Sequence, residues 1–348
     1  MTDSRPSKRA RCTTGTSGDP LAEEPTAGYQ RSDAFWLRDG NIILVAEKVA
    51  FRVHQSVLER KSEVFKDIFG LPQPENAETE SLEECPLVHV SDAAEDIRHL
   101  LSVLYDGDRV LGRKSPINMK MVFALLQLAI KYEIDYLRDE AISMLQTIYS
   151  PSYDEYVEQH GEDSVFPVQV TDRRDDQDPI IVINLAWKHG LHSLLPGAFF
   201  ACAKLSNKDL ARATKGSLRE DDLTRLSDED LERCLNGRAT LQSKYFNRFR
   251  SARMREVAST CPGNSGCETK LENFWDDLVV FGMEDIFNSR FDPLEEVNWE
   301  GFFLFCDACR AFHESQDLVH RMHMYRGLAD TFDLKRFLQG DSDAQAAD

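Results

Sequence analysis

The sequence lacks any apolar run of the roughly 20 residues that a membrane-spanning helix requires, so we expect no membrane partner. Met1 to Asp19 also lacks the apolar core of a secretory signal peptide. The 8 cysteines are scattered through 348 residues instead of being concentrated in a short chain, which favours a reducing compartment. We therefore expect an intracellular protein that resides in the cytoplasm, the nucleus or both.

Positive charge is also scarce, because the chain has 41 Lys and Arg against 60 Asp and Glu, for a net charge of -19. Nonspecific binding to nucleic acid depends on neutralising phosphates with basic residues, so we expect no nucleic-acid partner. The local exception runs from Lys244 to Arg255, where basic residues alternate with Tyr245, Phe246 and Phe249. This run is either a nucleic-acid stripe or an amphipathic helix with its aromatic side chains inward, and the overall charge favours the helix.

Motifs of common enzymes are absent as well. The sequence contains no GxGxxG, GxxxxGK[ST], GxSxG or HExxH. His313 and Glu314 begin like the helix of a zinc protease, but Asp317 occupies the place of the second histidine. We therefore predict a non-enzymatic protein with no catalytic and no cofactor-binding residues.

The pattern of apolar residues changes at His54. Phe51 and Val53 alternate with a polar residue, which is typical of a strand with one buried face, and apolar residues after His54 recur at helical spacing. The expected elements are strands over 42–45, 49–53 and 86–90, a helix over 55–69 that ends at Gly70, a helix around 97–104 and a helical pair over 121–149.

This switch from strand to helix resembles the signature of the BTB/POZ domain, in which a strand ending in Val-His runs into a helix carrying Leu and Ser-x-x-Phe. An opening strand and a later helical hairpin with an Ala-x-Lys-Tyr turn resemble further parts of the family. The matching residues are Asp39, Phe51, Val53, His54, Leu58, Ser62, Phe65, Ala129 and Tyr132. The resemblance implies an α+β BTB/POZ fold, a short β-sheet with surrounding helices, and the helical pattern from Ile180 onward predicts an all-α C-terminal domain.

His54 has two interpretations. A histidine at the junction of a strand and a helix is most often a structural hydrogen-bonding residue, and Asp39 is one candidate partner. A catalytic role would need an adjacent nucleophile, and the sequence pairs His54 with no cysteine or serine. We therefore expect this histidine to join the end of the strand to a neighbouring loop.

Composition divides the chain into five parts. We expect a disordered tail over 1–28, the BTB/POZ domain over 29–150, an acidic linker or insertion over 151–178, a helical domain over 179–340 and a disordered tail over 341–348. The stretch from Pro151 to Pro179 holds nine acidic residues against two basic ones. In the first tail, the basic run from Lys8 to Arg11 is either a nuclear import signal or solvated charge.

BTB/POZ domains are protein-interaction modules, so the resemblance implies a protein-binding adaptor or scaffold. Many members pair with themselves, which implies a homodimer, and many carry substrates to cullin-type ubiquitin ligases. Leu82 to Glu84 is an approximate counterpart of their apolar-x-Glu cullin contact. A second hypothesis is a self-associating transcriptional or scaffolding regulator. The region after Tyr149 resembles, more loosely, the larger BTB proteins of mushroom-forming fungi.

Two cysteine pairs form the only constellation with candidate site chemistry. Cys261 and Cys267 flank a short glycine-bearing loop, and Cys306 and Cys309 lie one helical turn apart. Four thiolates suit a structural zinc ion, but core or free thiols and a redox dithiol at Cys306 and Cys309 are also open. Three histidines could substitute as ligands or lie on the surface: His313, His320 and His323. A thiol- or metal-dependent enzyme built on these cysteines is the third functional hypothesis.

Overall fold

The computed structural model describes residues 28–70, 81–110, 116–160, 169–215, 222–263, 265–280, 292–299 and 304–338. Both expected tails, apart from Gly28, and the basic run from Lys8 to Arg11 lie outside the described residues. The chain divides into two compact units, Met1–Leu104 and Tyr105–Asp348, which are described separately. The domain limits expected from the sequence stay a prediction.

The first unit is built on a five-stranded mixed sheet with the order β1-β3-β2-β5-β4. Its strands are β1 (Gln30–Trp36), β2 (Ile42–Ala46), β3 (Val49–Val53), β4 (Ser81–Leu82) and β5 (Cys85–Val90). The expected hairpin is confirmed, because β2 and β3 are antiparallel with Ile42 opposite Val53. β1 pairs with β3 and β5 pairs with β2 in parallel. Every residue of β2 is buried, as expected for a central strand.

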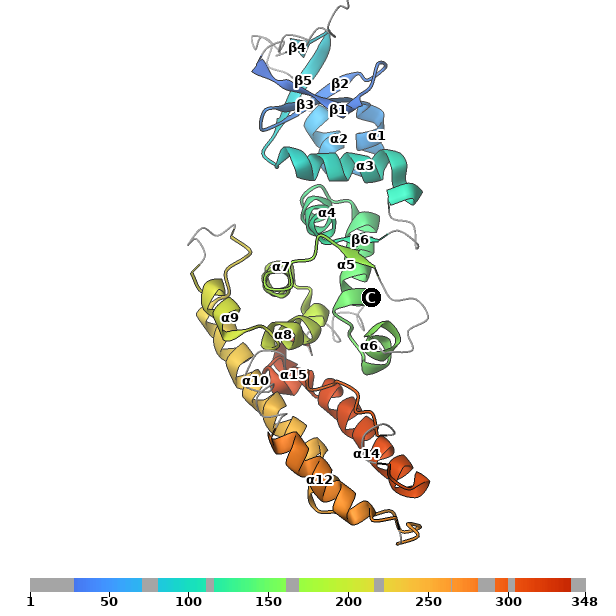
Figure 1. Ribbon diagram of the computed structural model, residues 1–348. Coiled ribbons are helices and arrows are strands. Elements are labelled where there is room, and N and C mark those ends of the chain that lie inside the picture. The colour runs from blue at the N-terminus through green and yellow to red at the C-terminus, as the bar shows by residue number, and fades with distance from the viewer. Residues whose placement is uncertain are drawn as a thin grey trace, which may run out of the picture. The chain divides into compact units, whose positions relative to one another are not determined.

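Three helices lie along one face of this sheet: α1 (Gln55–Lys61), α2 (Glu63–Gly70) and the first part of α3 (Ala94–Val110) (Figure 1). The single helix expected over 55–69 is wrong. The backbone of Ser62 is extended, with φ -146° and ψ 119°, and ends α1. The hydroxyl of Ser62 then accepts a hydrogen bond of 3.0 Å from the backbone N–H of Phe65, which caps α2.

The second unit is mostly helical. Its helices are α4 (Met119–Lys131), α5 (Asp135–Ile148), α6 (Tyr153–His160), α7 (Asp178–His189), the 3-10 turn η2 (His192–Leu194), α8 (Leu195–Ala203), α9 (Asn207–Ala213), α10 (Asp228–Arg248), α11 (Arg250–Arg253), α12 (Cys267–Val280), α14 (Asp307–Arg326) and α15 (Leu328–Thr331). The expected helical pair is present as α4 and α5. The segment expected as a linker or insertion contains α6 and β7 (Val170–Thr171), which pairs in parallel with β6 (Ile117–Asn118). None of the described helices is long and apolar enough to cross a membrane.

One hydrophobic core joins α4 and α5 to the later helices of this unit. At Gly197 on α8, an added Cβ atom would lie 2.9 Å from the carbonyl carbon of Tyr149, so only glycine permits this close approach. The hydroxyl of Tyr325 on α14 donates a 2.6 Å hydrogen bond to the carbonyl of Ser150. A chain cut near residue 150 would therefore leave apolar faces of α4 and α5 uncovered.

One end of the unit is formed by parts of α10, α12 and α14 (Figure 1). Ser227 is the N-cap of α10, and its hydroxyl accepts a 3.1 Å hydrogen bond from the backbone N–H of Asp230. The helical pattern expected from Ile180 onward is interrupted at Trp299 and Phe305, since neither residue is helical. Phe305 instead leads directly into α14, whose N-cap is Cys306.

Candidate metal centre

Four cysteine side chains from three separate segments meet near α12 and α14. Cys261 lies in the loop after α11, and Cys267 is the first residue of α12. Cys306 is the N-cap of α14, and Cys309 lies in its first turn. Their sulfur atoms all lie within 4.8 Å of one another. The structure thus brings both predicted pairs together, and the cluster could bind a metal ion.

Two glycines shape the loop between Cys261 and Cys267. Gly263 has a φ of 73° and Gly266 a φ of 62°, both in the left-handed region where a side chain would be strained. Each glycine allows the chain to reverse direction without a steric penalty. The loop therefore brings the thiols of Cys261 and Cys267 close together, in a backbone conformation that residues other than glycine rarely adopt at positions 263 and 266.

The separation between the sulfur atoms of Cys261 and Cys306 suits a single tetrahedral ion. Ligands about 2.3 Å from a tetrahedral zinc lie about 3.8 Å from each other. The Sγ atoms of Cys261 and Cys306 are 3.7 Å apart, and no member of the cluster forms a disulfide. Four thiols also leave no open coordination position, which is typical of structural zinc and not of catalytic zinc.

Hydrogen-bond donors surround the sulfur atoms. The backbone N–H of Cys306 donates to Cys267 Sγ at 3.5 Å, and that of Ala258 donates to Cys309 Sγ at 3.4 Å. The hydroxyl of Ser265 lies 3.2 Å from Cys267 Sγ. Such donors stabilise negative sulfur, and they orient the ligands of a metal site. The sequence alone did not identify Ala258 or Ser265, because their roles depend on where the loop folds.

Three of the four thiols have pKa values that depart from the ordinary value of a cysteine. The backbone amide of Gly263 lowers the pKa of Cys261, and the amide of Cys309 lowers the pKa of Cys306. Burial raises the pKa of Cys309 to about 12. A coordinated cation would deprotonate this thiol, so metal binding would turn a buried, protonated thiol into a ligand.

His313 lies beside the centre but is not part of it. Its Nε2 atom is 3.0 Å from the carbonyl oxygen of Glu256, so Nε2–H donates and Nδ1 accepts from the hydroxyl of Ser251 at 3.2 Å. The ring also stacks on Trp299 with centroids 5.2 Å apart. Among the described residues, the metal-binding group contains four cysteines and none of the histidines that we considered as substitutes.

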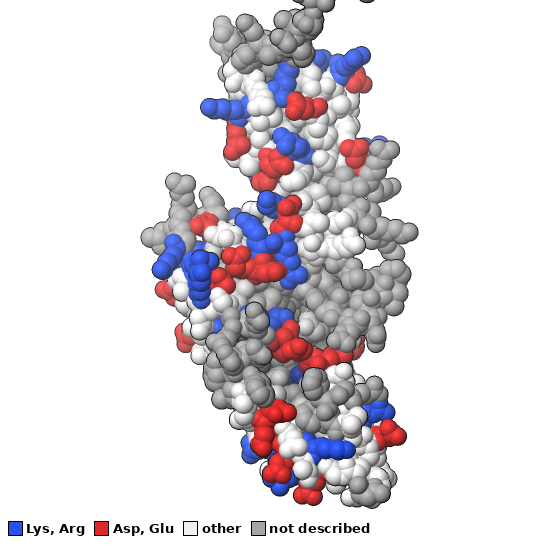
Figure 2. All heavy atoms as spheres, in the orientation of Figure 1, with Lys and Arg blue, Asp and Glu red and all other residues white. Residues whose placement is uncertain are grey.

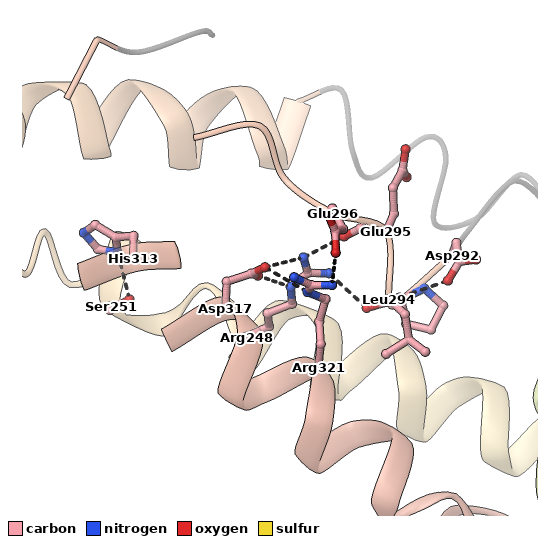
Figure 3. A network of polar contacts seen from close by, with 10 residues as sticks. Arg248, Ser251, Asp292, Leu294, Glu295, Glu296, His313, Asp317 and Arg321 are labelled. Atoms are coloured by element: carbon pink, nitrogen blue, oxygen red, sulfur yellow. Dashed lines mark hydrogen bonds and ion pairs between the residues drawn. The ribbon is translucent and has the colours of Figure 1, made fainter. Parts of the chain in front are cut away.

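A buried ion-pair network lies next to His313 and Ser251 (Figure 3). The fully buried guanidinium of Arg248 donates to both oxygens of Asp317 and to the carbonyls of Pro293 and Glu295. Arg321 donates to the same carboxylate at 3.0 Å. Asp317, which stands where the HExxH motif has its second histidine, is therefore a structural anion that joins α14 to α10, and its partner Arg248 extends the network to the 292–296 segment.

Several side chains of the basic and aromatic run from Lys244 to Arg255 contact other parts of the helical unit. Lys244 donates to the hydroxyl of Thr331 at 2.7 Å, and Arg255 pairs with Glu272 on α12. Phe249 is buried in an aromatic cluster. Acidic and basic side chains are interspersed on the visible face of α12 and α14 (Figure 2). This arrangement matches the amphipathic-helix interpretation.

The signature residues of the first unit serve its packing. Phe51, Val53, Leu58 and Phe65 are fully buried, and Ser62 is the cap described above. His54 is the N-cap residue of α1, and its Nε2 atom lies 3.3 Å from a carboxylate oxygen of Asp39. A hydrogen bond from its own backbone N–H lowers the pKa of the Asp39 carboxyl most, and the hydrogen bond with His54 lowers it further. This histidine therefore joins the strand end to the preceding loop, the structural role expected of it.

The remaining signature residues shape the turn between α4 and α5 in the second unit. Tyr132 is the C-cap of α4 and is buried. The carbonyl of Ala129 accepts a 2.8 Å hydrogen bond from the backbone N–H of Ile134, which precedes α5. A backbone hydrogen bond therefore closes the turn, and both signature residues have structural roles there.

Residues 37–149 match the family model of the BTB/POZ domain. The chain therefore contains a BTB/POZ domain, a type of domain that generally mediates interactions between proteins and is typically non-catalytic. A search of curated proteins found no match to the chain. The looser resemblance to fungal proteins accordingly stays a prediction.

A separate cavity of about 370 Å³ lies in the second unit. Its lining includes four aromatic residues, Tyr149, Tyr156, Phe200 and Tyr325, together with Arg173 and Lys204. Both cations pair with carboxylates. None of the lining residues is a cysteine, so the cavity and the sulfur cluster are different places on the molecule.

Proposed function

We propose that this protein is an intracellular, non-enzymatic adaptor that brings two proteins together. Its BTB/POZ domain contacts one partner, and the helical region over 179–340 holds another. The observation that carries this proposal is the BTB/POZ domain at residues 37–149, because such domains generally bind proteins. The closed donor set of the cysteine cluster supports a structural and not a catalytic role for the proposed metal site.

We further propose that the four cysteines hold one structural zinc ion. The 3.7 Å separation between Cys261 and Cys306 supports a mononuclear tetrahedral site, and the four sulfur ligands match the preference of zinc. The ion would link the loop after α11, the start of α12 and the start of α14. These segments already share contacts, such as the Arg255–Glu272 ion pair and the bond between His313 and the carbonyl of Glu256, and the metal would add a further link between them.

Metal analysis of the purified full-length chain tests this site. We expect about one equivalent of zinc in the native chain, and a loss of that zinc in Cys267→Ser. The matched control is Cys234→Ala, which changes a buried thiol outside the cluster and should retain the metal. The absence of stoichiometric zinc from the native chain would end the proposal.

Presentation of substrates to a cullin-type ubiquitin ligase is one form that the adaptor could take. The Leu82 to Glu84 segment offers limited support, since Leu82 is buried and Glu83 accepts hydrogen bonds from Arg31 and Arg52. A cullin contact would therefore use another surface. Tyr136 on α5 is 47% exposed and is the side chain that we select as a probe of such a surface.

Two measurements on the full-length chain distinguish the forms of the adaptor. Sedimentation shows whether the chain self-associates, and co-purification with a cullin shows whether it joins a ligase. We expect Tyr136→Glu to weaken the interaction that is present by about tenfold or more, whereas Glu140→Gln on the same helix should not. Fragments are avoided, because a cut near residue 150 divides the common core. A monomer that co-purifies with no protein would contradict the adaptor role.

A further inference from the structure

The four cysteines of the proposed metal centre differ in their access to solvent. Cys267 is 3% exposed and Cys309 is 0% exposed. Cys261 and Cys306 are both partly exposed. A dissolved reagent therefore meets Cys261 and Cys306 before it meets the other two thiols. The centre thus has a solvent-facing pair and a buried pair.

The solvent-facing pair is also close enough to be joined. The two Sγ atoms are 3.7 Å apart, and a disulfide requires a separation of about 2.0 Å. Cys261 belongs to a loop that contains Gly263, whereas Cys306 begins the 20-residue helix α14. A shift of about 1.7 Å is within the range that a surface loop can make. The loop side of the pair can move while the helix side stays in place.

We propose that Cys261 and Cys306 are a thiol modification site at which a hydroperoxide forms a disulfide and thereby expels the metal ion. The proposal rests on the zinc site proposed above. It also assigns distinct roles to the four ligands: two react with the oxidant, and the other two stay reduced.

The reaction balances with one hydroperoxide as the oxidant. One of the two thiolates attacks an oxygen of the hydroperoxide, so that an S–O bond forms, the O–O bond breaks, and water or an alcohol leaves after protonation. The other thiolate then attacks the sulfenic sulfur, an S–S bond forms, and the departing hydroxide takes up a proton to give water. Two electrons pass from sulfur to oxygen. The cation loses two of its four ligands and departs.

The disulfide would preserve only one of the metal's links. It would still join the loop after α11 to the start of α14, but Cys267 at the start of α12 would lose its connection. Trp299 would report this change, because its ring lies 4.8 Å from Phe274 on α12 and 5.2 Å from His313 on α14. Oxidation is therefore expected to loosen α12 against α14 without unfolding the unit.

A peroxide titration of the zinc-loaded full-length chain tests the proposal. Released zinc is measured with a colorimetric chelator, and disulfides are mapped by mass spectrometry after the free thiols have been alkylated. We expect about one zinc released for each Cys261–Cys306 disulfide, with recovery of the metal after reduction and addition of zinc. Cys202 and Cys234, which contact each other but are fully buried, are the internal control and should stay reduced.

The outcomes separate the two proposals. A purified chain without zinc contradicts the metal site before any peroxide is added, and mapping of that chain then still tests whether Cys261 and Cys306 form the disulfide. A disulfide that includes Cys309, or zinc release with sulfinic acids and no disulfide, would overturn the modification site. So would retention of zinc at peroxide concentrations that oxidise an exposed cysteine in an unrelated control protein.

Discussion

The guanidinium of Arg248 on α10 forms a buried ion pair with the carboxylate of Asp317 on α14. The two side chains are 0% and 4% exposed, and no other described pair of opposite charges is as completely removed from water. Arg248 also donates to the carbonyls of Pro293 and Glu295, and Asp317 also accepts a hydrogen bond from Arg321. Both charged groups are therefore hydrogen-bonded inside the fold. This pair therefore determines how α10 and α14 are held together beside the candidate metal centre.

Replacing Asp317 with Asn should destabilise the helical unit strongly. The change leaves Arg248 buried without a full counter-charge, which typically costs about 3–5 kcal/mol of the free energy of unfolding. Urea titration followed by circular dichroism measures this loss. The matched control is Glu272→Gln, which removes the exposed partner of Arg255 and should cost at most about 1 kcal/mol. Equal effects of the two variants would contradict a dominant role for the buried pair.

Gly237→Ala should also destabilise the unit, although alanine is the better helix former by about 1 kcal/mol. A Cβ atom at this position on α10 would lie 2.1 Å from Cε1 of Phe332. That ring is buried and stacks on Phe199, so it cannot move aside. We expect a net loss of about 1–3 kcal/mol in thermal or chemical unfolding. Asn236→Ala at the exposed neighbouring position should be neutral or slightly stabilising.

Stability should fall in mild acid because of His313. Burial lowers the pKa of His313 in the folded protein, whereas the unfolded chain has an ordinary histidine pKa of about 6.5. The unfolded state then binds more protons, so the stability contributed by neutral His313 is complete above about pH 6.5 and is lost as the pH falls below it.

Unfolding measured between pH 5 and 7.5 tests this dependence. The free energy of unfolding should change less steeply with pH in His313→Gln than in the native chain. Subtracting one slope from the other cancels the contributions of groups that both chains share, including the thiols. Identical slopes in His313→Gln and the native chain would contradict the prediction.

Removal of the metal should lower the thermal midpoint of the helical unit. A zinc ion that binds only the folded centre stabilises it by mass action, so a chelator removes that contribution. Trp299 is 4% exposed, and its fluorescence should shift to longer wavelength as the segments around it separate. Cys234→Ala should respond to the chelator as the native chain does, whereas Cys267→Ser should no longer respond. A native chain that is indifferent to chelation would rule out a stabilising ion.

Local sequence patterns were sufficient for much of the first unit. The alternation around Phe51 and Val53 predicted the hairpin, because such alternation places one face of a strand in the core. The pattern did not reveal β1, whose seven residues are mostly polar and which pairs with β3 in parallel. It also missed the break at Ser62, since the apolar spacing continues across this residue, although its backbone is extended and its hydroxyl caps the next helix.

For the candidate site, the sequence by itself determined the chemistry: two pairs of thiols, glycines where the loop must turn, and no enzyme motif. Only the tertiary structure decided that the pairs meet, because Cys267 and Cys306 are separated by 39 residues. It also decided that Asp317 is the partner of Arg248 and that His313 is excluded from the metal-binding group. Such choices depend on long-range packing of α10, α12 and α14, which no local spacing encodes.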